Sequence, residues 1–144
     1  MNWCWKKLNS VANKSVKYAL LLVLGVLALN ALAYGCWFIA APREGLGEFG
    51  YPTAPVLSGA LYLVGLVGVA MLGAAAFALL AIFLLVRGRP GGLVVSLVLG
   101  ASYLGVGLCA LLNGMTVDAL IYGGFGALVT ALSVAMGMSG PKQA

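Results

Sequence analysis

The chain has 144 residues, of which 63% are hydrophobic and only 8% are charged. Soluble domains carry about 45–50% apolar and about 25% charged residues, so this composition excludes a soluble domain and predicts a chain whose solvent is lipid. Histidine is absent, which removes the commonest general acid–base and the commonest neutral metal ligand. The three cysteines, at positions 4, 36 and 109, have the spacing of neither a disulfide framework nor a zinc site. We expect no metal and no cofactor.

Four uncharged apolar stretches predict four membrane-spanning helices, because a helix needs about 20 apolar residues to cross a hydrocarbon core of about 30 Å. They cover about residues 18–41, 56–86, 93–112 and 117–138. The second stretch exceeds the core thickness, so we expect it to tilt, bend or protrude. Short connections such as the Pro- and Gly-containing turn at residues 87–92 leave no room for a soluble domain. The predicted fold is a single membrane domain over residues 1–144, an all-α integral membrane four-helix bundle packed through Gly and Ala.

The basic residues predict the orientation of this bundle. Residues 1–17 form a basic flank before the first span. Because four crossings return the chain to its starting side, this flank, the turn between the second and third spans and the C-terminal tail lie on one side of the membrane. All basic residues except Arg43 are then on that side. The positive-inside rule makes the more basic side cytoplasmic. We therefore expect a bacterial inner-membrane protein with both termini inside, and we interpret the net charge of +5 mainly as an insertion signal rather than as a nucleic-acid site. The basic residues on the inner side are Lys6, Lys7, Lys14, Lys17, Arg87, Arg89 and Lys142.

The N-terminal segment has a second interpretation, as a cleaved signal peptide. Its lysines would form the basic region, Leu20 to Leu29 the apolar region, and residues 31–33 an A-x-A cleavage site. The apolar run continues beyond that site to Ala40, which favours a retained first helix. Both interpretations remain open at this point.

Small residues recur every four positions in the spans, a pattern typical of helices that pack closely in lipid. Glycine alone accounts for 21 residues, about twice its usual share of roughly 7%. The contact could lie within one chain, which we favour, or between copies of the chain. The predicted stripes are Ala119, Gly123, Ala127, Ala131 and Ala135 in the fourth span, Ala101, Gly105 and Cys109 in the third, Ala70, Ala74 and Ala78 in the second, and Ala31 with Gly35 in the first.

Polar side chains near the middle of the spans are candidate binding groups, because polar groups are costly to place in lipid. Asn30 lies near the midpoint of the first span, and Tyr34 follows one turn later on the same face. Alternatively, Asn30 hydrogen-bonds a neighbouring helix and contributes about 0.6–2 kcal/mol to packing. The residues of this candidate polar pocket are Asn30, Tyr34, Tyr62, Ser102 and Tyr103.

A second candidate site lies at the outer ends of the helices. Asp118 is the one carboxylate beside a span, and it could bind a proton or cation there or simply stabilise the N-terminus of the last helix. Glu44 and Glu48 have i, i+4 spacing, but Gly45 and Gly47 argue against a helix between them. The residues of this candidate outer-mouth site are Asp118, Tyr122, Arg43, Glu44 and Glu48.

The chain resembles small bacterial four-span proteins of the DoxX-like kind. The resemblance rests on the number and size of the spans and on residues 41–52, in which Pro42 follows the first span and Phe49-Gly50 lies near the end of a short loop. It implies a four-helix membrane fold and a loose association with membrane redox or stress partners, and it brings no catalytic residues.

These patterns leave three functional hypotheses. The first is a non-enzymatic accessory or interaction subunit whose Gly/Ala faces dock on a membrane-protein partner or on a second copy. The second is a small-molecule or ion carrier or channel that uses the mid-membrane pocket and Asp118. The third, a membrane enzyme acting on a lipid-soluble substrate, has only Asp118 and Glu48 as acid–base candidates, so we lean against an enzyme.

Overall fold

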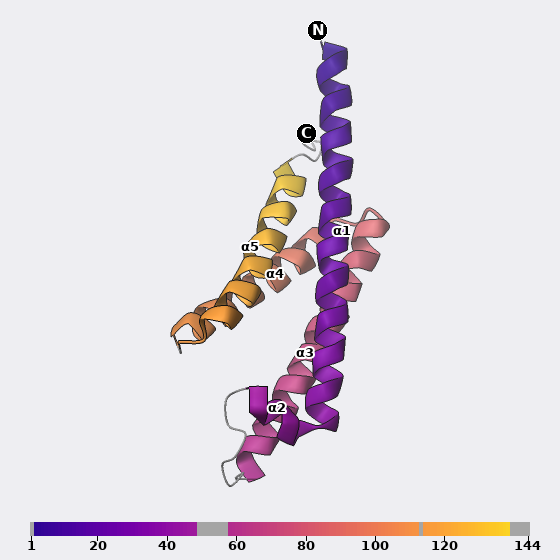
Figure 1. Cartoon of the computed structure of the whole chain (residues 1–144). Helices are drawn as coiled ribbons and strands as arrows, with labels where there is room; N and C mark the ends of the chain where they lie inside the picture. Colours follow the sequence, from indigo (N-terminus) through magenta and orange to yellow (C-terminus); the bar gives the residue numbers. More distant parts are fainter. Residues whose placement is uncertain (1, 49–57, 113, 139–144) are drawn as a thin grey trace. The chain divides into compact units, whose positions relative to one another are not determined.

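The computed structural model describes residues 2–48, 58–112 and 114–138, and the side chains of residues 14–45, 61–112 and 114–138. Its helices are α1 (Asn2–Ala40), α2 (Pro42–Glu48), α3 (Ser58–Val86), α4 (Gly91–Leu112) and α5 (Thr116–Met138) (Figure 1). Four of them, α1, α3, α4 and α5, are long and apolar enough to cross a membrane. The predicted all-α class with four spanning helices is confirmed, and the protein is a multi-pass membrane protein.

The basic flank is helical and continuous with the first span. α1 extends over 39 residues, and its apolar segment from Lys14 to Ala40 is 27 residues long, or about 40 Å at 1.5 Å per residue. The helix ends one residue before Ala41, whose N–H donates to the Trp37 carbonyl at 2.8 Å. Pro42 follows, as expected from a residue that lacks the N–H needed to continue the hydrogen-bond ladder.

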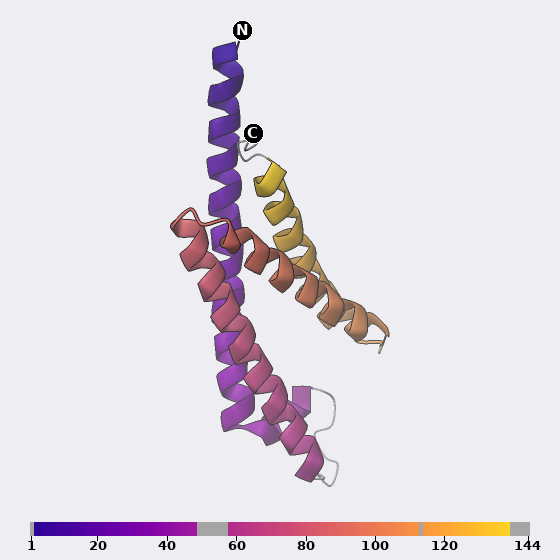
Figure 2. The ribbon, with the colours of Figure 1, turned by 180° about the vertical axis from the view of Figure 1, so that it is seen from behind.

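The turns after α3 and α4 have the same construction. Gly88 has φ +68° and Gly114 has φ +77°, a backbone region that is costly for residues with a Cβ atom. In the first turn the Gly88 N–H donates to the Leu85 carbonyl and the Arg89 N–H to the Leu84 carbonyl, at 3.1 and 2.9 Å. This is the Schellman pattern, and the second turn repeats it, so both helices end sharply and α4 and α5 form a tight hairpin (Figure 2).

The chain divides into two compact units. Unit 1 comprises residues 1–25 and 78–144, and unit 2 comprises residues 26–77. The fully buried side chains of unit 1 include Leu20, Leu24, Leu85, Ser96, Val129 and Ser133. In unit 2 a smaller cluster forms around Phe38 and Val64, with Trp37, Leu61 and Met71 packed against it.

The prediction that glycines prevent a helix between Glu44 and Glu48 is wrong. α2 spans Pro42–Glu48, and its first turn is closed by the Gly45 N–H, which donates to the Ala41 carbonyl at 3.1 Å. A Cβ atom on Gly45 would lie 2.7 Å from Cδ1 of Phe38 and 3.0 Å from Cγ1 of Val64. Glycine is therefore present because α2 packs directly on α1 and α3, and this contact outweighs the helix propensity of about 1 kcal/mol that glycine loses.

Candidate functional site

The closest helix contact lies between α4 and α5, where glycine meets backbone. A Cβ atom on Gly107 would lie 2.5 Å from the nitrogen of Gly123, and one on Gly126 would lie 2.5 Å from the nitrogen of Leu104. A Cβ atom on Gly100 would lie 2.5 Å from Oγ1 of Thr130 and 3.0 Å from its nitrogen. We call this contact the α4–α5 seam; its residues are Gly100, Leu104 and Gly107 of α4 and Gly123, Gly126 and Thr130 of α5.

The predicted stripes lie largely outside this seam. In α4 the predicted residues Ala101, Gly105 and Cys109 are all exposed, and in α5 Ala127, Ala131 and Ala135 are exposed. At about 100° per residue, a four-residue repeat drifts by about 40° per step. Five residues at this spacing, separated by four steps, therefore span about 160° of the helix surface, and they cannot all lie on one contact face. The shorter pair Ala31 and Gly35 is buried, since it makes only one step.

The seam instead follows spacings of three, four and seven residues. Gly100 and Gly107 are seven residues apart, which is about 20° short of two full turns. Along α5 the spacing alternates between four and three, so five positions on the contact face stay within an arc of about 80°. These positions are Ala119, Gly123, Gly126, Thr130 and Ser133. The sequence contained this signal, but the strict four-residue repeat beside it was the more visible one.

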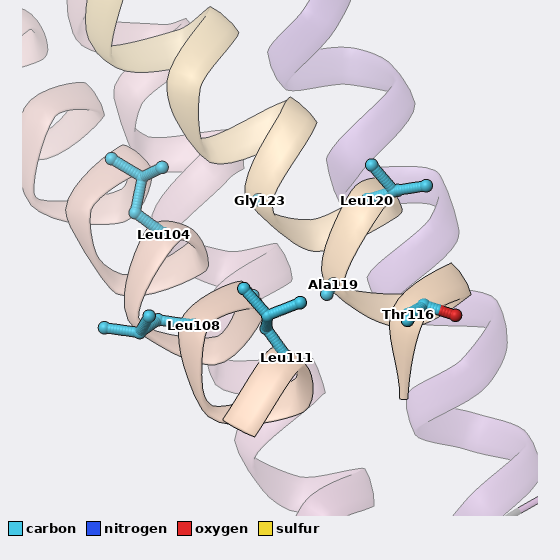
Figure 3. Close-up of a pocket in the computed structure, with 8 residues that line it drawn as sticks. Leu104, Leu108, Leu111, Thr116, Ala119, Leu120 and Gly123 are labelled. Atoms are coloured by element: carbon cyan, nitrogen blue, oxygen red, sulfur yellow. The ribbon is translucent and has the colours of Figure 1, made fainter. Parts of the chain in front are cut away.

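Towards the turn between α4 and α5 the seam opens into a groove of about 450 Å³. Figure 3 shows Leu111 of α4 and Ala119 of α5 at its opening, with Gly123 above them on α5. The side chains at its edge are strongly exposed, at 58% for Leu108, 56% for Leu111 and 77% for Leu120. Thr116 carries the one hydroxyl of the lining, which comprises Leu104, Gly107, Leu108, Leu111, Thr116, Ala119, Leu120 and Gly123.

Beyond the glycines of the seam, α4 and α5 carry three buried hydroxyl side chains that the sequence did not single out. The buried Ser96 hydroxyl donates to the Gly92 carbonyl of its own helix at 2.8 Å. The hydroxyls of Thr130 and Ser133 are buried and find no hydrogen-bond partner within the described residues. An unsatisfied hydroxyl in an apolar interior is costly, so this part of the α4–α5 contact is less stable than its close packing suggests.

One contact joins residues from the two predicted sites. The rings of Tyr103 and Tyr122 have centroids 6.1 Å apart at 43°, and Tyr103 is only 9% exposed. Asp118 is half-buried in the first turn of α5 and lies four residues before Tyr122, on the same side of the helix. Tyr103, Tyr122 and Asp118 therefore belong to one unit.

The other members of the predicted polar pocket divide between the two units. Asn30, Tyr34 and Tyr62 belong to unit 2, whereas Ser102 and Tyr103 belong to unit 1. Asn30 is half-buried, and Tyr34 and Tyr62 are exposed. The exposed Ser102 hydroxyl donates to the Val98 carbonyl at 2.9 Å, within its own helix. A pocket assembled from these residues stays a prediction.

The outer-mouth residues divide in the same way. Arg43 and Glu44 are exposed on α2 and belong to unit 2, whereas Asp118 and Tyr122 belong to unit 1. Glu44 accepts a hydrogen bond from Nε1 of Trp37 at 3.3 Å, a partner that the sequence analysis did not foresee. The Glu48 side chain, like Phe49 and Gly50, lies outside the described residues. Cys36 and Cys109 are both exposed and belong to different units.

No family model, curated protein or solved structure matches this chain. The resemblance to DoxX-like proteins therefore stays a prediction. Three features of the described residues can contact a ligand or partner: the α4–α5 seam with its groove, the Tyr103–Tyr122 contact, and the α1–α2 corner around Trp37 and Glu44.

Proposed function

We propose that the protein is a non-enzymatic accessory subunit of the bacterial inner membrane that docks a transmembrane helix of a partner membrane protein. The groove between α4 and α5 carries this proposal. Ala119 and Gly123 line it with little or no side chain, which lets another backbone approach closely, as association in lipid requires. The exposed leucines at its edge offer van der Waals contacts and no charge that would orient a polar substrate.

The experiment is photo-crosslinking in native membranes, with a photoreactive amino acid in place of Leu108 or Leu120 on the edge of the groove. Val94, which is 61% exposed near the start of α4, provides a control position. We expect one defined protein adduct from the two groove positions and none from position 94. Adducts with lipid alone, or equal adducts from all three positions, would argue against a docked helix.

A matched pair of variants tests whether the groove itself is responsible. Ala119→Leu fills the groove and is expected to abolish the adduct, whereas Ala127→Leu adds the same volume at an exposed position of the same helix and is expected to preserve it. Affinity purification in mild detergent then identifies the partner by mass spectrometry and measures its stoichiometry.

The proposed orientation places both termini in the cytoplasm. It is supported by the exposed Arg87 and Arg89 in the α3–α4 turn, because basic residues are enriched on the cytoplasmic side. A membrane-impermeant maleimide should label Arg43→Cys from outside intact cells but should not label Arg87→Cys, each in a background with the native cysteines replaced by serine. The reverse pattern would invert the topology.

A carrier function is the second candidate, favoured by the contact of Tyr103 with Tyr122 one turn from Asp118. Purified protein in liposomes would then transport a proton or small cation, and Asp118→Asn would abolish the flux while Arg89→Gln, in the α3–α4 turn, preserved it. Uptake that persists in Asp118→Asn would remove Asp118 from the mechanism.

A further inference from the structure

Three aromatic rings gather at the end of α1, immediately before α2. The ring centroids of Tyr34 and Trp37 are 5.9 Å apart, those of Tyr34 and Phe38 are 6.0 Å apart, and those of Trp37 and Phe38 are 5.6 Å apart. The ring plane of Tyr34 is inclined by 60° to that of Trp37 and by 61° to that of Phe38, whereas the rings of Trp37 and Phe38 are stacked, with an angle of 26° between their planes. The rings of Tyr34 and Trp37 therefore form two sides of a corner rather than a flat stack.

A carboxylate lies at the edge of this corner. Glu44 is exposed and accepts the Trp37 Nε1–H hydrogen bond at 3.3 Å. An indole N–H is a neutral donor, so this hydrogen bond orients the carboxylate without neutralising its charge. The corner thus combines the negative faces of aromatic rings with a full negative charge.

Tight packing beneath the corner fixes it in place. Phe38 is 4% exposed and packs with Val64 of α3. Gly45 of α2 lies so close that its Cβ would fall within 3.0 Å of both side chains. Because α2 cannot shift without disturbing this cluster, the packing fixes the backbone that carries Glu44 near Trp37.

The corner lies at the end of the apolar segment of α1. The apolar segment of α1 ends at Ala40, so Tyr34 and Trp37 occupy its last two turns and Glu44 follows just beyond. Tyr and Trp favour this interfacial region. The ligand that meets the corner there is one dissolved in water or one carried by a lipid headgroup.

We propose that Tyr34, Trp37 and Glu44 bind an alkylammonium group. Aromatic faces attract organic cations and recognise quaternary ammonium groups in particular, and the carboxylate supplies the complementary charge. Tyr34 is 40% exposed and Trp37 is half-buried, which leaves ring surface for the cation while the other side of Trp37 stacks on Phe38. The ammonium can belong to a choline- or ethanolamine-type lipid headgroup or to a free amine, and the experiment below separates these sources.

The test uses the fluorescence of Trp37 in the full-length protein. The chain has three tryptophans, so Trp3→Phe with Trp5→Phe leaves Trp37 as the one indole. The protein is placed in nanodiscs of phosphatidylglycerol, which carries no ammonium, and titrated with choline chloride. Sodium chloride and 3,3-dimethylbutan-1-ol, the neutral isostere of choline, serve as controls. We expect a saturable change in emission with choline and with neither control.

Two variants show whether the named groups carry the binding. Glu44→Gln keeps an oxygen acceptor for Trp37 but removes the charge, and Tyr34→Leu removes one ring face. Each is expected to weaken the apparent choline affinity about two- to fivefold, with the helical circular dichroism unchanged. Phe77→Leu, which removes an exposed ring of α3 outside the corner, is expected to keep the response. Equal responses to choline and sodium, or a Glu44→Gln variant that titrates like its parent, would overturn the proposal.

Nanodiscs of phosphatidylcholine identify the natural source of the ammonium. If a lipid headgroup fills the site, free choline changes the emission in phosphatidylglycerol but not in phosphatidylcholine. If the ligand is a free amine, the titrations agree in both lipids. Either result supports the alkylammonium site.

Discussion

The α4–α5 seam and the contact between α1 and α3 both depend on glycine, but the glycines meet different atoms. In the seam, the atoms nearest to a Cβ on Gly107 or Gly126 belong to the backbone. In unit 2, a Cβ on Gly35 would lie 2.9 Å from Cδ2 of Leu72, a side-chain tip, and 3.0 Å from the carbonyl oxygen of Gly68. A side-chain tip can move, whereas the backbone of a packed helix cannot move without displacing its neighbours.

This difference shows that small residues at a helix contact are not interchangeable. Gly107 and Gly123 face each other, yet a Cβ on Gly107 would lie 2.5 Å from Gly123 whereas the nearest atom to a Cβ on Gly123 is 3.9 Å away. Helix geometry directs one Cβ at the partner and the other past it. Whether a position requires glycine therefore depends on the direction of its Cα–Cβ bond. Residue spacing in the sequence does not give that direction.

The largest effect is expected from Gly126→Ala. Its Cβ would lie 2.5, 2.8 and 2.9 Å from three backbone atoms of α4, so the two helices must separate. We expect the free energy of unfolding to fall by about 3 kcal/mol or more, at or above the upper end of the range typical of overpacking. Unfolding in a detergent titration measures this change. Gly124→Ala is the control, because nothing lies within 4 Å of its Cβ. A Gly126→Ala variant as stable as Gly124→Ala would show that α4 and α5 do not pack as described.

Gly107→Ala is expected to lower the free energy of unfolding slightly less, by about 2–3 kcal/mol. Gly123→Ala should cost little, because its Cβ makes only an ordinary contact with Cα of Gly107. The same unfolding measurement on both single variants tests the asymmetry. Equal losses would mean that the two helices cross with a different rotation.

In unit 2, Gly35→Ala is expected to cost about 1–2 kcal/mol, less than either seam variant. Most of this loss should be recovered by Leu72→Ala in the same chain, because shortening Leu72 removes two of the three close atoms. A double-mutant cycle measures the coupling between the two sites. If the losses in stability of the two single variants simply add, the strain lies at the Gly68 carbonyl. The close contact of Gly35 would then be with backbone, as it is in the seam.

The two buried serines of α4 and α5 are expected to change the free energy of unfolding in opposite directions and by smaller amounts. Ser96→Ala loses a buried hydrogen bond, worth about 0.6 kcal/mol in membrane helices, and should be mildly destabilising. Ser133→Ala removes a buried hydroxyl without a partner and should be neutral or stabilising by up to about 1 kcal/mol. Destabilisation by Ser133→Ala would show that its hydroxyl bonds a group that the described residues do not supply.

The fold class was predictable because it depends on properties that add up along the chain. Four uncharged runs of sufficient length set four spanning helices, and the ends of α3, α4 and α5 at Val86, Leu112 and Met138 match the predicted ends of the spans. Gly88 and Gly114 mark turns in the sequence because positive φ is costly for other residues. The lengths of the spans and the positions of the turns depend on residues that are close together in the sequence.

The contacts were less predictable because they depend on rotation about each helix axis. The exposed Ala101 and the buried Gly100 are adjacent in sequence but about 100° apart on the helix. α2 was missed for a related reason, since Gly45 has low helix propensity and its value lies in contacts with Phe38 and Val64. The Trp37–Glu44 hydrogen bond across the α1–α2 corner depends on that helix and was missed with it.

The smallest effect is expected from Ala127→Leu, on the exposed side of α5. If this face meets lipid, an added isobutyl group exchanges one apolar surface for another, and both stability and the yield of cross-linked oligomer should stay unchanged. If it is a seam between copies, the added volume should lower the oligomer yield while the monomer stays folded. Cross-linking in membranes, compared with Gly105→Ala on the exposed face of α4, distinguishes these outcomes. α4 and α5 pack closely through the seam without contributions from Ala127, Ala131 or Ala135. These three residues of the predicted stripe would therefore have a role in association only if Ala127→Leu lowers the oligomer yield.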